Sequence, residues 1–287
     1  MTLPLSRRRF NSRLLRWHAW ARRPLVIRTA ANPWEVLVAE VMSQQTGIER
    51  VGPMWRRFVD LWPTPAALAA AGTQDLLAAW SGLGYNRRAL ALREAARAIV
   101  ADHGGRVPGT ISALEALPGI GPYTARAVAA AAFAVPVAPL DVNVRRVVSR
   151  VLGTSPADPR LQALADDLVS RAEPGRWFAA VMDLASGTCL PRMPLCDACP
   201  LAAVCGSRGA GPVAAIERKS AGAPFPTTTR WLRGRLVAAA TAAPGDAWLP
   251  LPDRLGVHDR DAIRVAARSL ELEGFVELRD DEVRVRH

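Results

Sequence analysis

The chain contains almost no lysine. Lys219 is the only lysine among 37 basic residues, and it lies in a stretch rich in Gly, Ala and Pro that is typical of a linker. Covalent catalysis through a Schiff base commonly uses the amine of a lysine. The remaining amine, at Met1, begins a plain Arg-rich segment. We therefore expect any chemistry performed by this chain to proceed without a Schiff base.

Long apolar runs are also missing. The N-terminal sequence MTLPLSRRRFNSRLLRWHAWARR has no continuous apolar core of the kind found in secretory signals. The Ala-rich run 125–138 contains Arg126 and Pro136 and is too short to span a bilayer. Half of the residues are nevertheless hydrophobic, so the chain can bury a core. We expect a soluble, cytoplasmic, nucleoid-associated protein with no membrane partner.

The formal net charge of +11 comes almost entirely from arginine. Such a strongly basic balance favours a polyanionic partner such as nucleic acid. The alternative is a basic protein that merely lies near ribosomes or membranes.

Cysteine is absent everywhere except within one stretch, CLPRMPLCDACPLAAVC, where the spacing is C-x6-C-x2-C-x5-C. Four thiols so close together in a chain without a secretory signal indicate metal ligands rather than two disulfides. The uneven spacing differs from the matched C-x2-C pairs of zinc knuckles. All-cysteine ligation suits a [4Fe–4S] cluster, although spacing alone leaves zinc open. The four residues are Cys189, Cys196, Cys199 and Cys205.

Most of residues 11–187 show helical periodicity, interrupted by Gly and Pro. One apolar helix is expected over WEVLVAEVMSQQT after Pro33, with Trp34, Leu37, Val38 and Val41 as its buried stripe. No fixed period recurs, which favours a compact all-α domain over a solenoid. Further helices are expected at 48–61, 65–70, 73–80, 86–102, 112–116, 123–134, 141–152, 159–172 and 176–185.

The pattern changes after the cysteines. The expected division is a helical core at 1–187, the cysteine loop at 188–206, a linker at 207–228 and a small C-terminal module at 229–287. In this module we expect helices at Trp231–Ala240, Leu249–Leu255 and Asp259–Glu273, followed by a hairpin that turns at Asp280-Asp281. This order of elements is that of a winged helix.

The third of these helices carries Arg260, Arg264 and Arg268 on one face, as a DNA-reading helix does. Asp259, Asp261, Glu271 and Glu273 offset this charge. A structural or partner-binding role for the module is an equal alternative.

The segment LPGIGPYTA lies between two expected helices. Gly119 and Gly121 would let backbone N–H groups at a helix start approach a phosphate closely. Such a contact holds DNA without reading its sequence. The alternative for a lone G-x-G turn is a helix C-cap.

Two carboxylates stand out. Asp141, in PLDVNVRRV, is placed to cap a helix, and a carboxylate presented there can also act in catalysis. Glu40, in AEVMSQQT, falls at the edge of the apolar stripe, where partial burial would raise its pKa and suit a general acid. The alternative for Glu40 is an ordinary solvated glutamate.

Together, LPGIGPYTA, LDVNVRRV, EVMSQQT and the cysteine loop resemble the helix-hairpin-helix, iron–sulfur (endonuclease III-like) DNA glycosylases over roughly residues 11–206. Glu40 and the triplet Gln44-Gln45-Thr46 resemble the MutY-type adenine glycosylases in particular. The resemblance implies an all-α, two-part glycosylase core with a [4Fe–4S] cluster loop, followed here by the winged-helix-like (α+β) module.

The resemblance also implies roles for single residues. Asp141 takes the place of the catalytic aspartate, Glu40 that of the general acid, and Asn143 that of a group orienting Asp141. Tyr123 stands where strand-nicking relatives carry lysine, and tyrosine cannot form an imine. Residues implied to bind the extruded adenine, or to fill or flank the opened base stack, are Arg28, Asp183, Gln44, Gln45, Thr46, Leu83 and Tyr85.

The implied activity is that of a monofunctional, monomeric base-excision-repair glycosylase acting on double-stranded DNA. It would hydrolyse the N-glycosidic bond of adenine mispaired with guanine or 8-oxoguanine and leave an abasic site.

Some features depart from the family pattern. The tail is too short for the Nudix-like domain that checks for 8-oxoguanine, and Val26-Ile27 replaces an aromatic wall of the adenine pocket. Ser43 and Asn86 also differ from the usual residues. One alternative is a thymine or uracil glycosylase acting on T·G or U·G pairs. Alternatives of another class are a non-catalytic DNA-damage-binding protein and a zinc-dependent transcription regulator.

Overall fold

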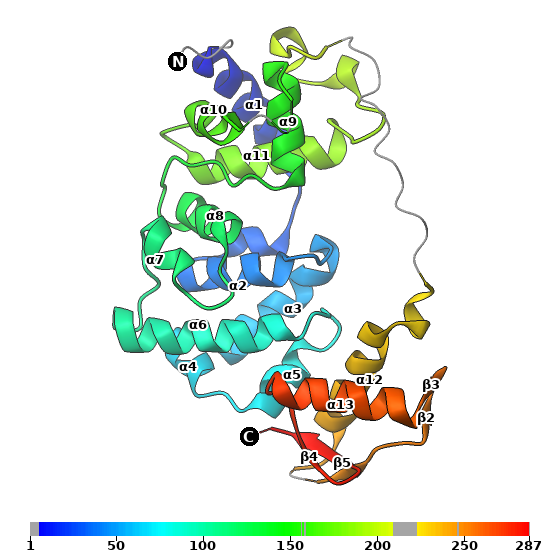
Figure 1. Cartoon of the computed structure of the whole chain (residues 1–287). Coiled ribbons are helices and arrows are strands. Elements are labelled where there is room, and N and C mark those ends of the chain that lie inside the picture. Colours follow the sequence, from blue (N-terminus) through cyan, green and yellow to red (C-terminus); the bar gives the residue numbers. More distant parts are fainter. Residues whose placement is uncertain (1–5, 156, 158, 209–222, 246, 287) are drawn as a thin grey trace. The chain divides into compact units, whose positions relative to one another are not determined.

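A computed structural model describes residues 6–155, 157, 159–208, 223–245 and 247–286 (Figure 1). The chain divides into two compact units, each made of two separate segments. The first comprises Met1–Val41 and Val107–Glu217, and the second Met42–Arg106 and Arg218–His287.

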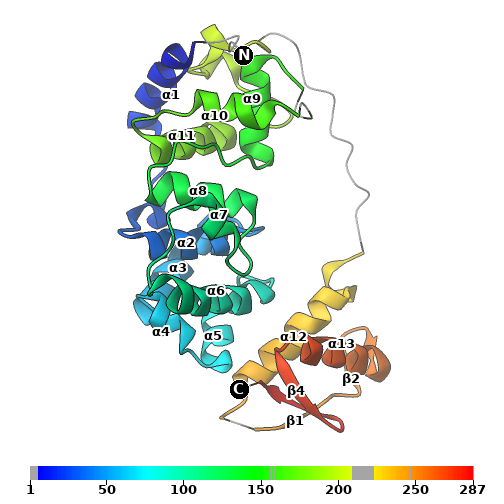
Figure 2. The same cartoon turned by 60° about the vertical axis from the view of Figure 1, so that its left-hand side comes forward.

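The first unit is helical, and a single long helix lies at its centre. This helix, α11, packs against α1, α8 and α9, and Figures 1 and 2 show the four grouped together. Trp177 of α11 and Phe10 of α1 are fully buried, with ring centroids 6.3 Å apart. The elements of the first unit are α1 (Arg7–Ala21), η1 (Val26–Thr29), most of α2 (Pro33–Ser43), α7 (Ile111–Glu115), α8 (Pro122–Ala132), α9 (Val142–Leu152), α10 (Leu161–Leu168), α11 (Pro174–Gly187), η2 (Cys196–Ala198) and η3 (Ala202–Val204).

The second unit joins a helical part to the C-terminal module. In the helical part Phe58 packs edge-on against Trp80, with 5.7 Å between ring centroids, and both are fully buried. Its helices are α3 (Ile48–Leu61), α4 (Pro65–Ala69), α5 (Thr73–Trp80) and α6 (Arg87–His103), and the module contains η4 (Phe225–Thr227), α12 (Thr229–Ala242) and α13 (Arg260–Leu272).

Five short strands complete the described part of the module. β5 (Glu282–Val285) lies between β1 (Leu249–Pro250) and β4 (Val276–Arg279) in an antiparallel sheet. β2 (Arg254–Leu255) pairs with β3 (His258–Asp259). Arg279 pairs with Glu282, so the hairpin turns at Asp280-Asp281 as predicted, and Asp280 takes a left-handed φ of 54°.

The module is seated on α5. Leu77 of α5 is buried in the module's own core, next to Leu236, Ile263 and Phe275. The side-chain amide of Gln74 donates hydrogen bonds to the backbone carbonyls of Thr241 and Ala243, at 3.3 and 2.8 Å. An apolar anchor and two hydrogen bonds therefore fix the module to the helical part of its unit.

The predicted all-α core is confirmed, and a strand-containing C-terminal region is found. The predicted stripe of Trp34, Leu37, Val38 and Val41 is buried. Most predicted helices agree with the observed ones within two residues at each end.

Three helix predictions need correction. The helix expected at 249–255 is wrong, because Pro250 and Pro252 cannot donate helical hydrogen bonds and the segment forms strand pairs instead. The helix expected to run through Thr46 ends at Ser43, because Gln45 takes a left-handed conformation. α10 ends at Leu168 rather than 172, because Val169 is extended.

The expected division at 187, 206 and 228 stays a prediction. α11 ends at Gly187, where the cysteine loop was expected to begin, whereas linker residues 209–222, with Lys219, lie outside the described residues. Within the part of the chain that the structure describes, no helix combines the length and apolarity needed to cross a bilayer.

We expect Leu77→Ala to lower the free energy of unfolding of the second unit by about 2–5 kcal/mol, because it leaves a cavity in the core of the docked module. Urea unfolding followed by tryptophan fluorescence measures this loss. The control is Leu61→Ala, at a leucine that is 52% exposed, with an expected change within about 0.5 kcal/mol. Equal losses in the two variants would contradict the seating on α5.

Candidate active site and cysteine loop

Asp141 is the N-cap of α9. Its Oδ1 accepts hydrogen bonds from the backbone N–H groups of Asn143 and Val144, at 2.8 and 2.7 Å. Its Oδ2 accepts a third bond, at 2.7 Å, from the side-chain amide of Asn143. Three donors and the positive end of the helix dipole therefore hold the carboxylate in one orientation. The structure brings Asn143 to Asp141, as the sequence predicts.

Glu40 lies on α2 and is partly buried. Burial, and to a smaller extent the negative charge of Asp141, raise the pKa of Glu40 to about 7. Near neutral pH this carboxyl group therefore exists in both protonation states. A protonated carboxyl group beside a fixed carboxylate is an arrangement suited to acid catalysis.

Tyr123, on α8, lies within electrostatic reach of both carboxyl groups. Burial raises the pKa of its phenol, and the charges of Glu40 and Asp141 raise it further. Its ring packs edge-on against Phe178, 6.4 Å away between centroids. The phenol thus remains a protonated hydrogen-bond donor in a fixed position. The structure brings Glu40, Tyr123, Asp141 and Asn143 into one site.

A hydrogen-bond chain connects this site to the cysteine loop. Arg146 donates to the side-chain oxygen of Asn143 at 3.0 Å, and also to the backbone carbonyls of Cys189 and Ala185, at 2.9 and 3.0 Å. Arg146 therefore links Asn143, which orients Asp141, to Cys189, the first cysteine of the loop. Arg146 was not predicted from the sequence, although it lies inside the LDVNVRRV segment.

Arg150, one helical turn beyond Arg146, holds the rest of the loop entrance. Its guanidinium donates to the carbonyls of Leu190 and Pro191, both at 2.7 Å, and lies 3.4 Å from the sulfur of Cys189. This residue was also missed. The i, i+4 spacing of two arginines on a mostly buried helix was the available signal.

The far end of the loop returns to the same helix. The backbone N–H groups of Gly206 and Ser207 donate to the carbonyls of Val151 and Arg150, at 2.8 and 3.0 Å. A Cβ atom on Gly206 would lie only 3.0 Å from the backbone nitrogen of Gly153, so glycine allows this close approach without displacing the backbone of α9's end. α9 therefore binds both ends of the cysteine loop.

The four thiols lie within electrostatic reach of one another. Burial raises the pKa of Cys199 and of Cys205, and the other thiols raise both further. In the part of the chain that the structure describes, no three His, Cys, Asp or Glu side chains converge as ligands of one metal ion do. Four cysteines are the ligand set that a [4Fe–4S] cluster uses, and all four lie in this loop.

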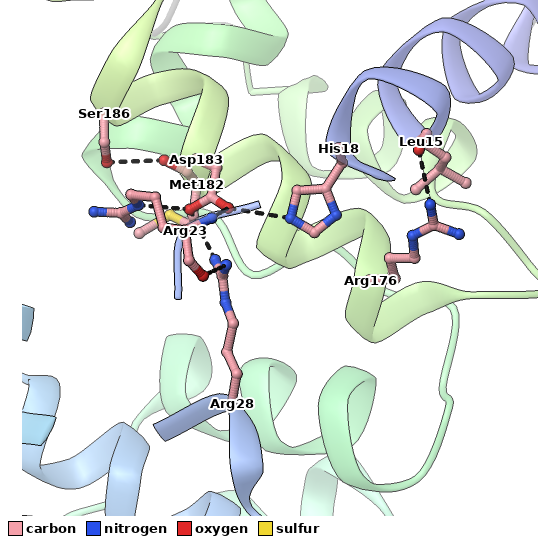
Figure 3. Close-up of polar contacts among 8 residues, drawn as sticks. All are labelled: Leu15, His18, Arg23, Arg28, Arg176, Met182, Asp183 and Ser186. Carbon is pink, nitrogen blue, oxygen red and sulfur yellow. Dashed lines mark hydrogen bonds and ion pairs between the residues drawn. The ribbon is translucent and has the colours of Figure 1, made fainter. Parts of the chain in front are cut away.

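Arg28 and Asp183 meet in a separate buried cluster (Figure 3). Asp183 accepts hydrogen bonds from the guanidinium groups of Arg23 and Arg28, both at 2.7 Å, and lies 3.1 Å from the ring of His18. Burial alone would raise the pKa of Asp183, but the hydrogen bonds from Arg28 and Arg23 outweigh it and hold the pKa below its usual value. His18 and Arg23 were missed because only folding brings α1 and α11 together.

The two glycines of the predicted hairpin lie at the start of α8. Gly119 has a φ of 75°, a conformation that glycine adopts without strain, and Gly121 is the N-cap of the helix. Both are exposed. The backbone at the start of α8 is therefore exposed to solvent, and backbone N–H groups at a helix N-terminus can bind anions.

Gln44, Gln45, Thr46, Leu83 and Tyr85 form a second group, within the second unit. Thr46 donates its hydroxyl to the carbonyl of Leu83 at 3.2 Å, which joins the two loops. Gln45 and Tyr85 have left-handed φ values of 54° and 49°, unusual for residues with side chains. Strain of this kind persists where the surroundings impose it, often at functional sites.

Arg88 imposes this conformation. Its guanidinium donates to the carbonyls of Met42, Gln44, Leu83 and Gly84 and to the hydroxyl of Thr46. A single cation thus fixes both loops. Arg88 was not predicted from the sequence, because its pattern there is that of an ordinary solvated arginine at a helix start.

A hairpin between two helices, a capped aspartate and a cysteine loop define the helix-hairpin-helix class of DNA glycosylases. Residues 38–171 match the family model described as "HhH-GPD superfamily base excision DNA repair protein". The chain is 41% identical over 240 residues to the adenine DNA glycosylase of Mycobacterium tuberculosis, covering 81% of this chain and 79% of that protein. The chain belongs to the MutY-type adenine DNA glycosylase family.

The chain is also similar to glycosylases named for a different base. A thymine-DNA glycosylase of Aeropyrum pernix is 34% identical over 203 residues, covering 67% of this chain and 91% of that protein. The solved structure of a thermostable thymine-DNA glycosylase matches with a TM-score of 0.66 and 29% identity, covering 70% of this chain and 96% of that one.

The raised pKa of Glu40 has a consequence for stability. Its value of about 7 exceeds the ordinary 4.5, so the folded protein holds this proton more tightly than the unfolded chain. The cost of burying the charge therefore grows as the pH rises from 4.5 and is complete above 7. We expect Glu40→Gln to be more stable than the parent at pH 8 by about 1–3 kcal/mol, and by less at pH 5.

Thermal unfolding of both proteins at pH 8 and pH 5 measures this difference. The matched control is Glu115→Gln, at an exposed glutamate of the same unit, whose effect should not change between the two pH values. A Glu40→Gln effect that is equally independent of pH would contradict the burial of this carboxyl group.

Proposed function

We propose that the chain is a monofunctional base-excision-repair DNA glycosylase that releases adenine mispaired with guanine or 8-oxoguanine. The observation that carries the proposal is the pair of carboxyl groups in contrasting settings. Asp141 is held by three N–H donors, whereas burial raises the pKa of Glu40 to about 7. Pairs of carboxyl groups whose environments differ in this way serve as acid and charge stabiliser in glycoside chemistry.

The proposed reaction starts with extrusion of the adenine from the duplex, since a stacked base cannot reach the site. Glu40 donates its proton to the adenine ring, and the N-glycosidic bond breaks with its electron pair leaving on the base. The ionised carboxylate of Asp141 stabilises the positive charge that develops on the sugar. Water then adds to the anomeric carbon and loses a proton, which leaves an abasic site in an intact strand.

Tyr123 and Asn143 are proposed to position these groups. Asn143 orients Asp141 through its amide, and Arg146 orients Asn143 in turn. The phenol of Tyr123 can donate a hydrogen bond but cannot form an imine with the sugar. Within the described residues the chain carries no lysine, so the proposed chemistry is hydrolysis without strand cleavage.

The remaining predicted residues are proposed to bind DNA. Gly119 and Gly121 would bind a phosphate at the start of α8. The strained loops with Gln44, Gln45, Thr46, Leu83 and Tyr85 would fill or flank the gap left by the extruded base. Arg28, fixed by Asp183, would form part of the adenine pocket. The proposed partner is double-stranded DNA with a mismatched or damaged pair, bound by a monomer.

Cys189, Cys196, Cys199 and Cys205 would hold a [4Fe–4S] cluster. A cluster bound there would order this loop, including Arg192, which is exposed and basic. It has no part in the proposed proton transfers.

A second candidate is excision of thymine or uracil opposite guanine. The absence of an aromatic residue at Val26-Ile27 favours it, because the smaller side chains there would make the pocket less selective for adenine. The triplet Gln44-Gln45-Thr46 and Glu40 favour adenine. A non-catalytic damage-binding protein would need neither carboxyl group.

The substrate is tested with single-turnover base release from duplexes carrying A·8-oxoG, A·G, T·G, U·G and A·T pairs, followed by alkali to cleave abasic sites. We expect release from A·8-oxoG and A·G, and none from A·T. Release restricted to T·G or U·G would replace adenine by a pyrimidine as the substrate. Binding without any release would make the chain a damage-binding protein.

Asp141→Asn tests the charge separately from the cap. Asparagine caps helices about as well as aspartate, so the fold should persist. Loss of the charge should lower the single-turnover rate at least about 100-fold. The matched control is Asp259→Asn, at the N-cap of α13, where the side chain accepts a hydrogen bond from Ala262 at 2.9 Å. The control should release adenine like the parent. An unfolded Asp141→Asn protein would assign Asp141 to capping alone, and a fully active one would remove it from the mechanism.

A further inference from the structure

A basic groove of about 1310 Å³ runs through the second unit. One wall is built from the two strained loops, Gln44–Gly47 and Gly82–Arg88, with Glu49 and Arg50 at the start of α3, and the other from η4 and α12 of the C-terminal module. The module therefore forms one side of a groove whose other side contains the residues proposed to enter the opened base stack.

The two walls are connected directly. Arg230 of α12 donates a hydrogen bond to the phenol oxygen of Tyr85 at 2.8 Å. Its guanidinium lies 5.4 Å from the ring centroid of Tyr85 and 5.1 Å from that of Phe225. Together with Leu77 and Gln74 of α5, this contact holds α12 beside the loops. The groove is thus a built feature of the unit rather than a gap next to a linker.

The groove is strongly cationic. Six arginines line it, Arg50, Arg87, Arg88, Arg230, Arg233 and Arg235, against one acidic residue, Glu49. Arg233 forms an ion pair with Glu273 at 2.8 Å, and Arg88 donates its hydrogen bonds mainly to backbone carbonyls of the loops. Arg50 and Arg235 are exposed and make no ion pair with any described residue, and Arg230 contacts only neutral groups. Uncompensated positive charge therefore remains on both walls.

The other arginine-rich face of the module is neutralised internally. Arg260 pairs with Asp253 and Asp281, at 2.7 and 2.8 Å, and Arg264 pairs with Asp281 at 2.7 Å. Two of the three arginines that the sequence offers for DNA reading on α13 are thus committed to partners in the module. α13 therefore keeps one exposed arginine, Arg268, whereas α12 presents Arg230 and Arg235 to the groove.

We propose that this groove binds the DNA backbone next to the opened base pair, with Arg230 and Arg235 of α12 contacting phosphates. This rests on the proposed function, because the loops of the opposite wall meet DNA only if the chain opens a base pair. Phosphodiesters complement the unpaired guanidinium groups, and the exposed rings of Tyr85 and Phe225 offer flat surfaces to sugars or bases. The C-terminal module is then a part of the DNA-binding surface at the lesion, not an appended domain for a separate partner.

The salt dependence of binding tests this proposal. The probe is a duplex with a tetrahydrofuran abasic analogue opposite guanine, which has no glycosidic bond to a base and is not turned over. Each lost phosphate contact lowers the slope of log Kd against log salt by about 0.9. We expect Arg235→Gln to lower the slope by that amount and to weaken binding about 3- to 10-fold near 0.15 M salt. Arg230→Gln with Arg235→Gln should roughly double the change in slope.

The matched control is Arg268→Gln, which removes the same charge from an exposed arginine on α13. It should change neither the slope nor the affinity by more than the error. Equal effects of Arg235→Gln and Arg268→Gln would overturn the proposal, because they would reflect net charge alone.

Photo-crosslinking keeps the proposal testable even if the substitutions disturb the groove. A benzoylphenylalanine placed at position 235 should crosslink within about four nucleotides of the abasic analogue, and one placed at 268 should not. Crosslinks from position 268 alone, or from 235 only to distant nucleotides, would refute it. Because the analogue is not turned over, this result is independent of adenine release. A positive crosslink in a protein that releases no base would retain the groove and reject the proposed enzyme.

Discussion

The cap formed by Asp141 on α9 is the interaction on which the rest of the first unit depends. The two backbone hydrogen bonds that begin the helix also fix the carboxylate, together with a third from the side chain of Asn143, so helix formation and site assembly are one event. Once α9 has formed, Arg146 and Arg150 project from it at helical spacing and bind the entrance of the cysteine loop. The loop returns to the end of the same helix through Gly206. A change at the loop can therefore reach the carboxylate through two residues, Arg146 and Asn143.

Glu40 illustrates the opposite relation between stability and function. Asp141 stabilises its helix, whereas Glu40 is a buried acid that destabilises the protein whenever it is charged. Such a group persists where its chemistry is needed, which is the usual exchange of stability for activity at a catalytic site. The left-handed Gln45 and Tyr85 represent the same exchange in the second unit, where Arg88 holds two strained loops in place.

Local patterns in the sequence predicted the features that depend on nearby residues. Helix periodicity gave the core helices and the buried stripe with Trp34, and the N-cap preference of aspartate gave Asp141. The unpredicted features join distant segments: Arg146 and Arg150 to the cysteine loop, His18 and Arg23 to Asp183, and Leu77 to the C-terminal module. No local pattern encodes these contacts. The helix prediction at 249–255 failed partly for a related reason: besides its two prolines, Leu249 and Pro250 pair with β5, which follows much later in the chain.

The pH dependence of adenine release within a preformed complex tests the central claim, that Glu40 supplies the proton, most directly. Single-turnover rates on an A·8-oxoG duplex would be measured from pH 5.5 to 9 for the parent and for Glu40→Gln. Since only the protonated acid is active, the parent rate should fall as the pH rises through about 7. Glu40→Gln should release almost no adenine at any pH. A parent rate that stays constant over this range, or a Glu40→Gln protein with the same profile as the parent, would contradict the account.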